Sequence, residues 1–209
     1  MVNLFNPDSV HVKTIIIGMI MAMTFATSAW ADDLPDRSHK PNLDNNWYAG
    51  LALGTLAYRQ DTLPDFRMDD RRIVVGKQWN RYLGTEVHLG GGVDDTESIN
   101  GIPVHLRIDN YVAGFIKGSF NVDAPVKDMD RLRVYGLLGV SRIKATSDDT
   151  VFSQSGAQTR AAFGMGLELI VDRLALQLGY LRYVNGSANG HDYTLDSLHL
   201  GVMYEFAGD

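Results

Sequence analysis

The sequence has no cysteine, so disulfide bonds and thiolate-ligated metal sites are excluded throughout its 209 residues. It also has no excess of basic residues, because 19 Lys and Arg stand against 25 Asp and Glu and the net charge is −6. Proteins that bind nucleic acid usually present a basic surface, so this balance argues against nucleic acid as a partner. The length is that of one domain or a small pair.

Long hydrophobic runs are nearly absent as well. The one such run, at residues 14–26, is shorter than the roughly 20 residues of a membrane-spanning helix. Lys13 precedes it, and Ala29-Trp30-Ala31 follows as a site of the kind that signal peptidase cleaves. We therefore predict that residues 1–31 are a cleaved signal peptide and that the mature chain is exported. An uncleaved anchor helix is the alternative, which the small and acidic residues after the run disfavour.

Helical periodicity is absent from the rest of the chain, and a period of two is present instead. After a polar N-terminal lead-in at residues 32–46, bulky apolar residues alternate with small or polar ones in six segments, which indicates strands at residues 47–58, 83–90, 132–141, 162–171, 174–181 and 197–206. Two further segments, at 71–80 and 108–120, complete a set of eight. Their faces stay unassigned, because Lys77 interrupts the apolar face of the first and the second is apolar on both faces.

The character of the two faces indicates the environment of the strands. A soluble barrel has bulky apolar side chains inside and charges outside, whereas glycine and alanine cannot fill such a core. A ring of Leu, Val and Phe suits lipid, and small or polar side chains suit a narrow lumen. The sequence thus predicts an all-β fold, an eight-stranded antiparallel up-and-down transmembrane β-barrel over residues 47–206, with a short C-terminal tail at 207–209.

Connection lengths and aromatic residues support this prediction. We expect long extracellular loops at 60–70, 94–103, 146–158 and 185–196, and tight periplasmic turns at Asn80-Arg81 and Asp172-Arg173, with a longer connection at 121–130. Six aromatic residues fall near the predicted periplasmic ends, as in an interfacial belt: Trp47, Trp79, Tyr82, Phe120, Tyr204 and Phe206.

Several short stretches resemble one known family. They are Trp47-Tyr48-Ala49-Gly50, Gly76-Lys-Gln-Trp-Asn-Arg-Tyr-Leu-Gly84, Tyr135-Gly136-Leu-Leu-Gly139, Gly164-Met-Gly166-Leu-Glu-Leu169 and Gly201-Val-Met-Tyr204-Glu-Phe206. Together they are similar to the OmpA/OmpX-like outer-membrane β-barrel domain family, over roughly residues 44–206. The resemblance implies an address in the outer membrane of a Gram-negative bacterium, and functions in that family range from structural barrel to adhesin.

The resemblance also implies partners. Gly201, Tyr204 and Phe206 are similar to the C-terminal signal by which the outer-membrane assembly machinery recognises such barrels, although here Ala207-Gly208-Asp209 follow the phenylalanine. Outer-membrane lipid and lipopolysaccharide are the other expected partners, and an unknown extracellular ligand is a further one.

The stretch Leu181–Ser187 is where an enzymatic function would be expected. Lipid A 3-O-deacylases carry a His-x-Ser-Asn motif there, but Arg182 and Val184 occupy the positions of the base and the nucleophile, and only Asn185 matches. Ser187 and His191 could replace them, but both are ordinary loop residues. We therefore predict no catalytic residues, no cofactor and no enzyme activity.

Other polar residues have a structural interpretation. We expect Glu86, His88, Glu168, His199 and Glu205 to line the lumen with Arg133 as a partner, either as a plug of paired charges or as a proton or metal site. The acidic groups Asp69-Asp70, Asp94-Asp95 with Glu97, Asp148-Asp149 and Asp192 are expected to be solvated rather than to bind Ca²⁺. Gly90-Gly91-Gly92 precedes no helix, so it is not a phosphate-binding loop. No metal site is predicted.

We accordingly expect a structural or surface-interaction (adhesin-like) role through the four extracellular loops. The alternatives are a lipid A-modifying outer-membrane enzyme and a soluble periplasmic lipocalin-like carrier.

Overall fold

The computed structural model describes residues 45–60, 64–99, 101–122, 131–148, 153–188 and 191–206. The predicted signal peptide at 1–31, most of the lead-in at 32–46 and the tail at 207–209 lie outside these residues. Within the described part of the chain, no helix has the length and apolar character needed to cross a membrane.

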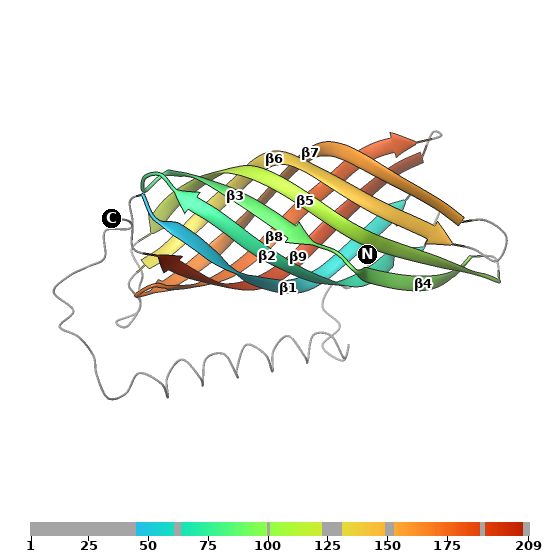
Figure 1. Cartoon of the computed structure of the whole chain (residues 1–209), viewed down its shortest axis with the longest axis horizontal. Helices are drawn as coiled ribbons and strands as arrows, with labels where there is room; N and C mark the ends of the chain where they lie inside the picture. The colour runs from blue at the N-terminus through green and yellow to red at the C-terminus, as the bar shows by residue number, and fades with distance from the viewer. Residues whose placement is uncertain are drawn as a thin grey trace, which may run out of the picture. The chain divides into compact units, whose positions relative to one another are not determined.

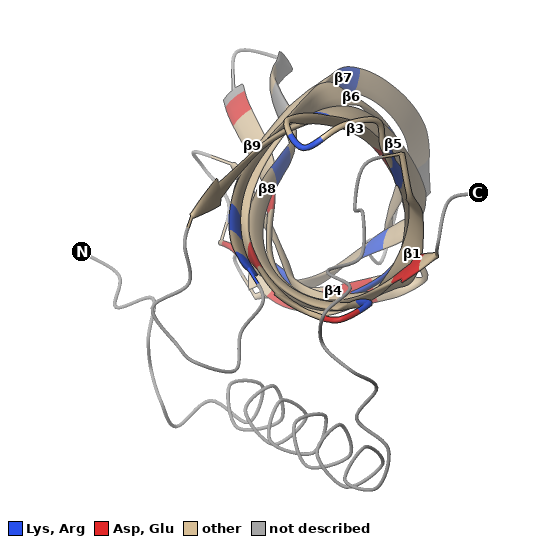
Figure 2. Cartoon of the chain, turned by 90° about the vertical axis from the view of Figure 1, so that its left-hand side faces the viewer, with Lys and Arg blue, Asp and Glu red and all other residues tan. Residues whose placement is uncertain are grey.

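The described residues form one antiparallel sheet that closes on itself as a barrel (Figure 1). Viewed from one end, the strands form a ring around a lumen (Figure 2). Closure is complete because β3 bonds to β2 on one side and to β5 on the other. The strands are β1 (Trp47–Gln60), β2 (Phe66–Gln78), β3 (Leu83–Gly90), β4 (Val93–Ile99), β5 (Ile102–Val122), β6 (Arg131–Asp148), β7 (Ser153–Val171), β8 (Leu174–Ala188) and β9 (His191–Phe206).

The predicted barrel class is confirmed, with nine strands among the described residues in place of the predicted eight. The extra strand arises because β3 and β4 both pair with β5 and together take the place of one barrel strand. Gly91 and Gly92 interrupt it with φ angles of 136° and 71°, which favour glycine. A Cβ at Gly91 would also lie 2.4 Å from the Cα of Asn110.

The four predicted loops are mostly strand, which corrects the loop boundaries. β2 begins at Phe66, β4 and the start of β5 occupy most of 94–103, β6 and β7 extend to Asp148 and from Ser153, and β8 and β9 extend to Ala188 and from His191. The polar composition of these segments suggested loops, but they are hairpins that continue the barrel wall.

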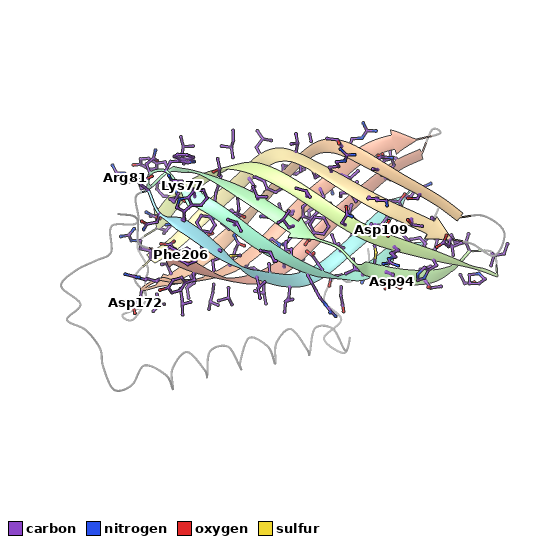
Figure 3. The ribbon with its side chains drawn as sticks, viewed as in Figure 1. Lys77, Arg81, Asp94, Asp109, Asp172 and Phe206 are labelled. Atoms are coloured by element: carbon purple, nitrogen blue, oxygen red, sulfur yellow. The ribbon has the colours of Figure 1, made fainter. Side chains whose placement is uncertain are left out.

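The two tight turns are confirmed. Asn80 Oδ1 accepts hydrogen bonds from the backbone N–H groups of Tyr82, at 2.9 Å, and Leu83, at 3.0 Å, which holds the turn between β2 and β3. Asp172, with φ of 53°, and Arg173 connect β7 to β8. Lys77, Arg81, Asp172 and Phe206 all lie at this end of the barrel, and Asp94 and Asp109 lie toward the other (Figure 3).

The outer face of the barrel carries bulky apolar side chains, as predicted. Leu138 is the most exposed of them at 68%, and others on all the long strands include Leu51, Ile73, Ile116, Met165, Leu178 and Val202. The two unassigned segments are now assigned. Lys77 is on the outer face of β2, and on β5 Val112 and Ile116 face outward while Tyr111 and Phe115 are buried in the lumen.

The polarity of the outer face reverses along β2. Ile73 and Val75 are exposed on the outside, but Arg67, Asp69 and Arg71, on the same face nearer the hairpin end, are charged. Opposite them, Phe66 and Met68 are buried inside. Between Phe66 and Arg71, the strand therefore has charges outside and, apart from the buried Asp70, apolar residues inside, which is the pattern of a water-soluble barrel.

The predicted lumen of small and polar residues is consequently wrong for the half of the barrel away from the two tight turns. That half contains most of a cluster of apolar side chains from eight strands, among them Leu56, Phe66, Met68, Leu106, Ile108, Tyr111, Ile143, Leu181, Tyr183, Tyr193 and Leu195. Burial of such side chains stabilises the fold by about 25 cal/mol for each Å² of apolar surface that is removed from water. The reversal on β2 and this cluster lie at the same end of the barrel, because Phe66 and Met68 of the reversed segment belong to the cluster.

The extension also divides into two four-stranded sheets. β2 bonds to β3 only from Arg72 onward, and β7 bonds to β8 only from Phe163 onward. Outside these limits, β8-β9-β1-β2 form one continuous sheet and β4-β5-β6-β7 the other. The apolar cluster contains residues of both sheets and lies between them.

We predict that Leu138→Arg lowers the free energy of unfolding of the barrel in lipid by roughly 2–4 kcal/mol, because the cation would face hydrocarbon. The matched control is Thr159→Arg, which puts the same side chain on an exposed residue of β7 beside Arg142, where we expect a change within about 0.5 kcal/mol. Urea unfolding in liposomes measures both. Equal stabilities of the two variants would contradict the assignment of faces.

Candidate functional site

The half of the lumen nearer the two tight turns contains a cluster of buried charges centred on Lys117. The ammonium Nζ of Lys117 lies 3.0 Å from Glu86 Oε2 and also binds Glu168 Oε1. Arg133 Nη1 lies 3.0 Å from Glu168 Oε2 and 3.7 Å from Glu205 Oε1. These residues come from β3, β5, β6, β7 and β9, and they meet because each occupies the inward phase of its strand.

A second cluster lies farther along the lumen, and His88 joins the two. Its Nε2 lies 2.6 Å from Glu86 Oε1, and its Nδ1 lies 3.3 Å from the hydroxyl of Tyr183. Arg72 donates to the same hydroxyl and lies 3.1 Å from Asp70 Oδ2. Asp70 also accepts hydrogen bonds from Ser197 Oγ, at 2.7 Å, and from the hydroxyl of Tyr111.

The pairing of these charges determines what the lumen can do. Every carboxylate named above has a cation within 4 Å, so the groups neutralise one another and leave no free charged face for a solute. Beyond Tyr111 and Tyr183 the apolar cluster fills the barrel. Buried charges require such partners, and the arrangement is a paired-charge plug below an apolar layer.

Some lumen atoms nevertheless have no hydrogen-bond partner within the described part of the chain. They are both ring nitrogens of His199, the hydroxyl of Tyr135, Nε of Arg72, Oε1 of Gln78, Oε1 of Gln177 and Oε2 of Glu205. The aromatic groups of Tyr135 and His199 both approach Gly179, where an added Cβ would lie 2.4 Å from the Tyr135 hydroxyl and 2.6 Å from His199 Nε2. Gly179 therefore provides the space that these two side chains occupy.

The sequence matches a known protein family over most of its length. Residues 17–206 match the outer membrane protein β-barrel domain. The chain belongs to this family. It is an outer-membrane protein, and its lipid-facing band and closed sheet have the geometry that this location requires.

Solved structures show the same fold at low identity. Neisserial surface protein A is 15% identical, with a TM-score of 0.59 over 77% of this chain and 97% of that one. Ail, the attachment invasion locus protein of Yersinia pestis, is 14% identical, with a TM-score of 0.52 over 77% of this chain and 99% of that one. No curated protein matches the sequence.

The outer-membrane barrel places all six predicted lumen residues inside. Glu86, His88, Arg133, Glu168, His199 and Glu205 are each at most 5% exposed, and all but His199 take part in the charge network. Asp70, Arg72 and Lys117 were not predicted as lumen residues. Lys117 could have been found as the lone cation in the apolar segment 111–120, whereas Asp70 and Arg72 lay in a predicted loop and at the start of an unassigned strand.

The residues that were compared with the deacylase motif have structural roles in the barrel. Arg182 Nε lies 2.7 Å from Asp196 Oδ1, and this ion pair also includes Arg59 Nη1, at 2.9 Å from Asp196 Oδ2. Val184 belongs to the apolar cluster. The side chains of Asn185, Ser187 and His191 lie outside the described residues.

The acidic groups weighed for Ca²⁺ are dispersed. Asp70 is inside the lumen, while Asp69 is on the outer face near Arg71. Asp94 lies 3.3 Å from His105 Nε2, and Asp95 accepts the backbone N–H of Arg67. Over the described ranges, no three His, Asp or Glu side chains come together in a way that could hold a metal ion. Asp149 is outside those ranges.

We predict that Lys117→Met lowers the free energy of unfolding by about 3–5 kcal/mol, because Glu86 and Glu168 would lose their shared cation while buried. Lys144→Met is the control, since Lys144 is half exposed and lies 3.9 Å from Asp109, and we expect it to cost about 0.2–1 kcal/mol. The double variant Lys117→Met/Glu168→Gln should recover part of the loss. Equal losses for Lys117→Met and the control would contradict the plug.

Proposed function

We propose that this outer-membrane barrel is a non-enzymatic surface-interaction protein, adhesin-like in role, and that its extracellular hairpins make the contact. The observation that carries the proposal is the open edge of β7. From Ser153 to Ala162 this strand bonds to β6 on one side, and no described strand bonds to its other side. All residues from 155 to 161 are exposed.

Such an edge is a template for strand addition. Its unpaired backbone N–H and C=O groups can pair with an extended peptide of another protein. Natural edge strands are commonly protected by Lys, Pro, inward charges or bulges, and the segment Ser153–Ala162 contains only Arg160 of this kind. The pairing with β6 is also continuous over the whole segment.

The other seam between the two sheets is covered, which makes the β7 edge distinctive. There Phe66 and Met68 of β2 pack with Val93 of β4 in the apolar cluster. Asp95 Oδ2 accepts the backbone N–H of Arg67 at 2.7 Å across this seam. At the β7 edge, by contrast, the exposed side chain of Gln158 accepts a hydrogen bond across the seam from the hydroxyl of Tyr193.

Charge near the edge favours an acidic partner segment. Arg160 is on β7 itself, and Arg142 pairs with Thr159 from β6. Both are exposed, and neither forms an ion pair with another described residue. An extended acidic segment could thus gain backbone hydrogen bonds and charge complementarity together. The name of Ail, as an attachment invasion locus protein, agrees with a role of this class, although its similarity shows only the fold.

The experiment compares intact and shortened hairpins. Removing residues 145–156, which include the register pair Ala145 and Gly156, and joining Lys144 to Ala157 through Asn-Gly should leave the membrane barrel intact. Purified protein would be tested on an array of host-matrix proteins. We expect binding by the intact barrel and at least about a tenfold loss on shortening, equal to 1.4 kcal/mol. Equal binding, or none by either form, would contradict the proposal.

Proline variants at neighbouring positions give a matched control. Along a strand, successive N–H groups point to opposite edges. Of the two variants Gly156→Pro and Ala157→Pro, one therefore removes an N–H donor from the open edge. The other removes a hydrogen bond between β7 and β6. We expect only the first kind to abolish binding while thermal stability is preserved. Loss of binding strictly in proportion to loss of stability would indicate a folding effect instead.

The lipid A-modifying enzyme remains a separate candidate with its own test. Mass spectra of lipid A from cells with and without the protein should show the same acyl pattern if the barrel is not an enzyme. A changed pattern would replace the proposal. We also propose that β9 carries the assembly signal, with Gly201 facing inward and Tyr204 and Phe206 on the outer face, their ring centroids 5.3 Å apart.

A further inference from the structure

The outer face of β2 has an unusually short apolar span. Between the exposed Arg71 and the partly exposed Lys77, the outward residues are Ile73 and Val75 alone. Residues 71 and 77 are six apart, which is about 20 Å along a strand and roughly 15 Å along the membrane normal at a tilt near 40°. The apolar band of such barrels is about 25 Å tall. At least one of the two cations must therefore extend its side chain toward the headgroups, as long cationic side chains do.

Lys77 lies against two tryptophan rings, as expected for a side chain at the level of the lipid headgroups. Its Nζ is 4.5 Å from the ring centroid of Trp79 and 5.4 Å from that of Trp47. The Trp79 indole is itself held by a hydrogen bond of 3.3 Å to Thr85 Oγ1. Trp residues concentrate at the membrane–water interface, so the ammonium group lies at the level of the lipid headgroups.

A second cation lies at the same end of the barrel. The guanidinium of Arg81, in the turn between β2 and β3, is 4.9 Å from the ring centroid of Tyr82. Lys77 and Arg81 are at the same end of the barrel (Figure 3). Neither is paired with a carboxylate among the described residues. Cation–π contacts orient both groups without neutralising their charge.

We propose that Lys77 and Arg81, with Trp47, Trp79 and Tyr82, form a binding site for the headgroup phosphate of an anionic phospholipid in the periplasmic leaflet. A phosphodiester is the anion available at this depth, and ammonium and guanidinium groups are its usual donors in proteins. Two unneutralised cations favour a phosphatidylglycerol-type headgroup over a zwitterionic one, whose own cation they would repel. The indole rings would contact the glycerol and upper acyl region.

Several cations at the other end of the barrel are paired with carboxylates. Arg107 and Lys144 share Asp109, at 3.4 Å and 3.9 Å, and Arg59 and Arg182 share Asp196. Carboxylates of the chain itself thus lie against these four cations, whereas Arg142 and Arg160 at the same end are exposed and form no ion pair with another described residue. Lys77 and Arg81 are therefore distinguished by their contacts with aromatic rings and not by the lack of a carboxylate alone.

Native mass spectrometry of the purified full-length protein would test the site. The protein in detergent would be titrated with phosphatidylglycerol and, separately, phosphatidylcholine of the same chains. We expect wild type to retain phosphatidylglycerol preferentially, and Lys77→Gln/Arg81→Gln to reduce that preference by about 30-fold, from the typical contribution of two basic residues near a membrane surface. Arg71→Gln/Arg142→Gln makes the same charge change at the other end and should leave the preference intact.

Three results would overturn the proposal. They are equal retention of the two lipids by wild type, an unchanged preference in Lys77→Gln/Arg81→Gln, and an equal loss in the control variant, which would indicate net charge alone. Heat-dependent gel mobility checks that the variants are folded. Should the double variant not fold, a salt titration of wild type decides: the preference must fall as salt screens the exposed cations, and an unchanged preference contradicts the site.

Discussion

Hydrocarbon offers no hydrogen-bond partner to a peptide backbone, and the closed sheet of this protein follows from that constraint. Each unpaired group in lipid would cost several kcal/mol, so β3 must bond to both β2 and β5 where the barrel crosses the membrane. Beyond the lipid the constraint ends, because water can satisfy the backbone. There the same strands separate into two sheets at the seams β2–β4 and β7–β8, and an edge is left open on β7. The surface proposed for interaction thus exists only where closure is no longer required.

The same boundary explains how the inside of the barrel changes along its length. Within the membrane, the outer face takes the bulky apolar residues, and the lumen is filled by a paired-charge network around Lys117. In the extension, water takes the place of lipid, so charges such as Arg67 and Asp69 face outward and apolar residues such as Phe66 pack inside. His88 and Tyr183 are the point where the two regimes meet. One set of strands therefore carries two opposite patterns of burial.

The sequence predicted the parts of the barrel that keep one pattern over their whole membrane segment. In β7 and β9, Phe163 and Leu198 start uninterrupted alternations, and their faces were assigned correctly. In β2 the alternation changes sign between Arg71 and Ile73, so a single-phase interpretation failed and the charged half was predicted as a loop. The lumen pairing of Lys117 with Glu86 and Glu168 depends on the register of strands distant in sequence, which periodicity alone does not supply. The break at Gly91-Gly92 was likewise visible as glycines but not as a strand interruption.

An accessibility scan of spin labels along the outer face of β2 in a lipid bilayer tests the central claim most directly. Labels at 67, 69, 71, 73 and 75 would be compared for collisions with oxygen, which concentrates in lipid, and with a water-soluble nickel complex. The account predicts that the labels at 67 and 69 meet the nickel complex, that those at 73 and 75 meet oxygen, and that the change occurs near Arg71. Nickel accessibility at 73 and 75 equal to that at 67, or protection of all five positions from both reagents, would contradict it.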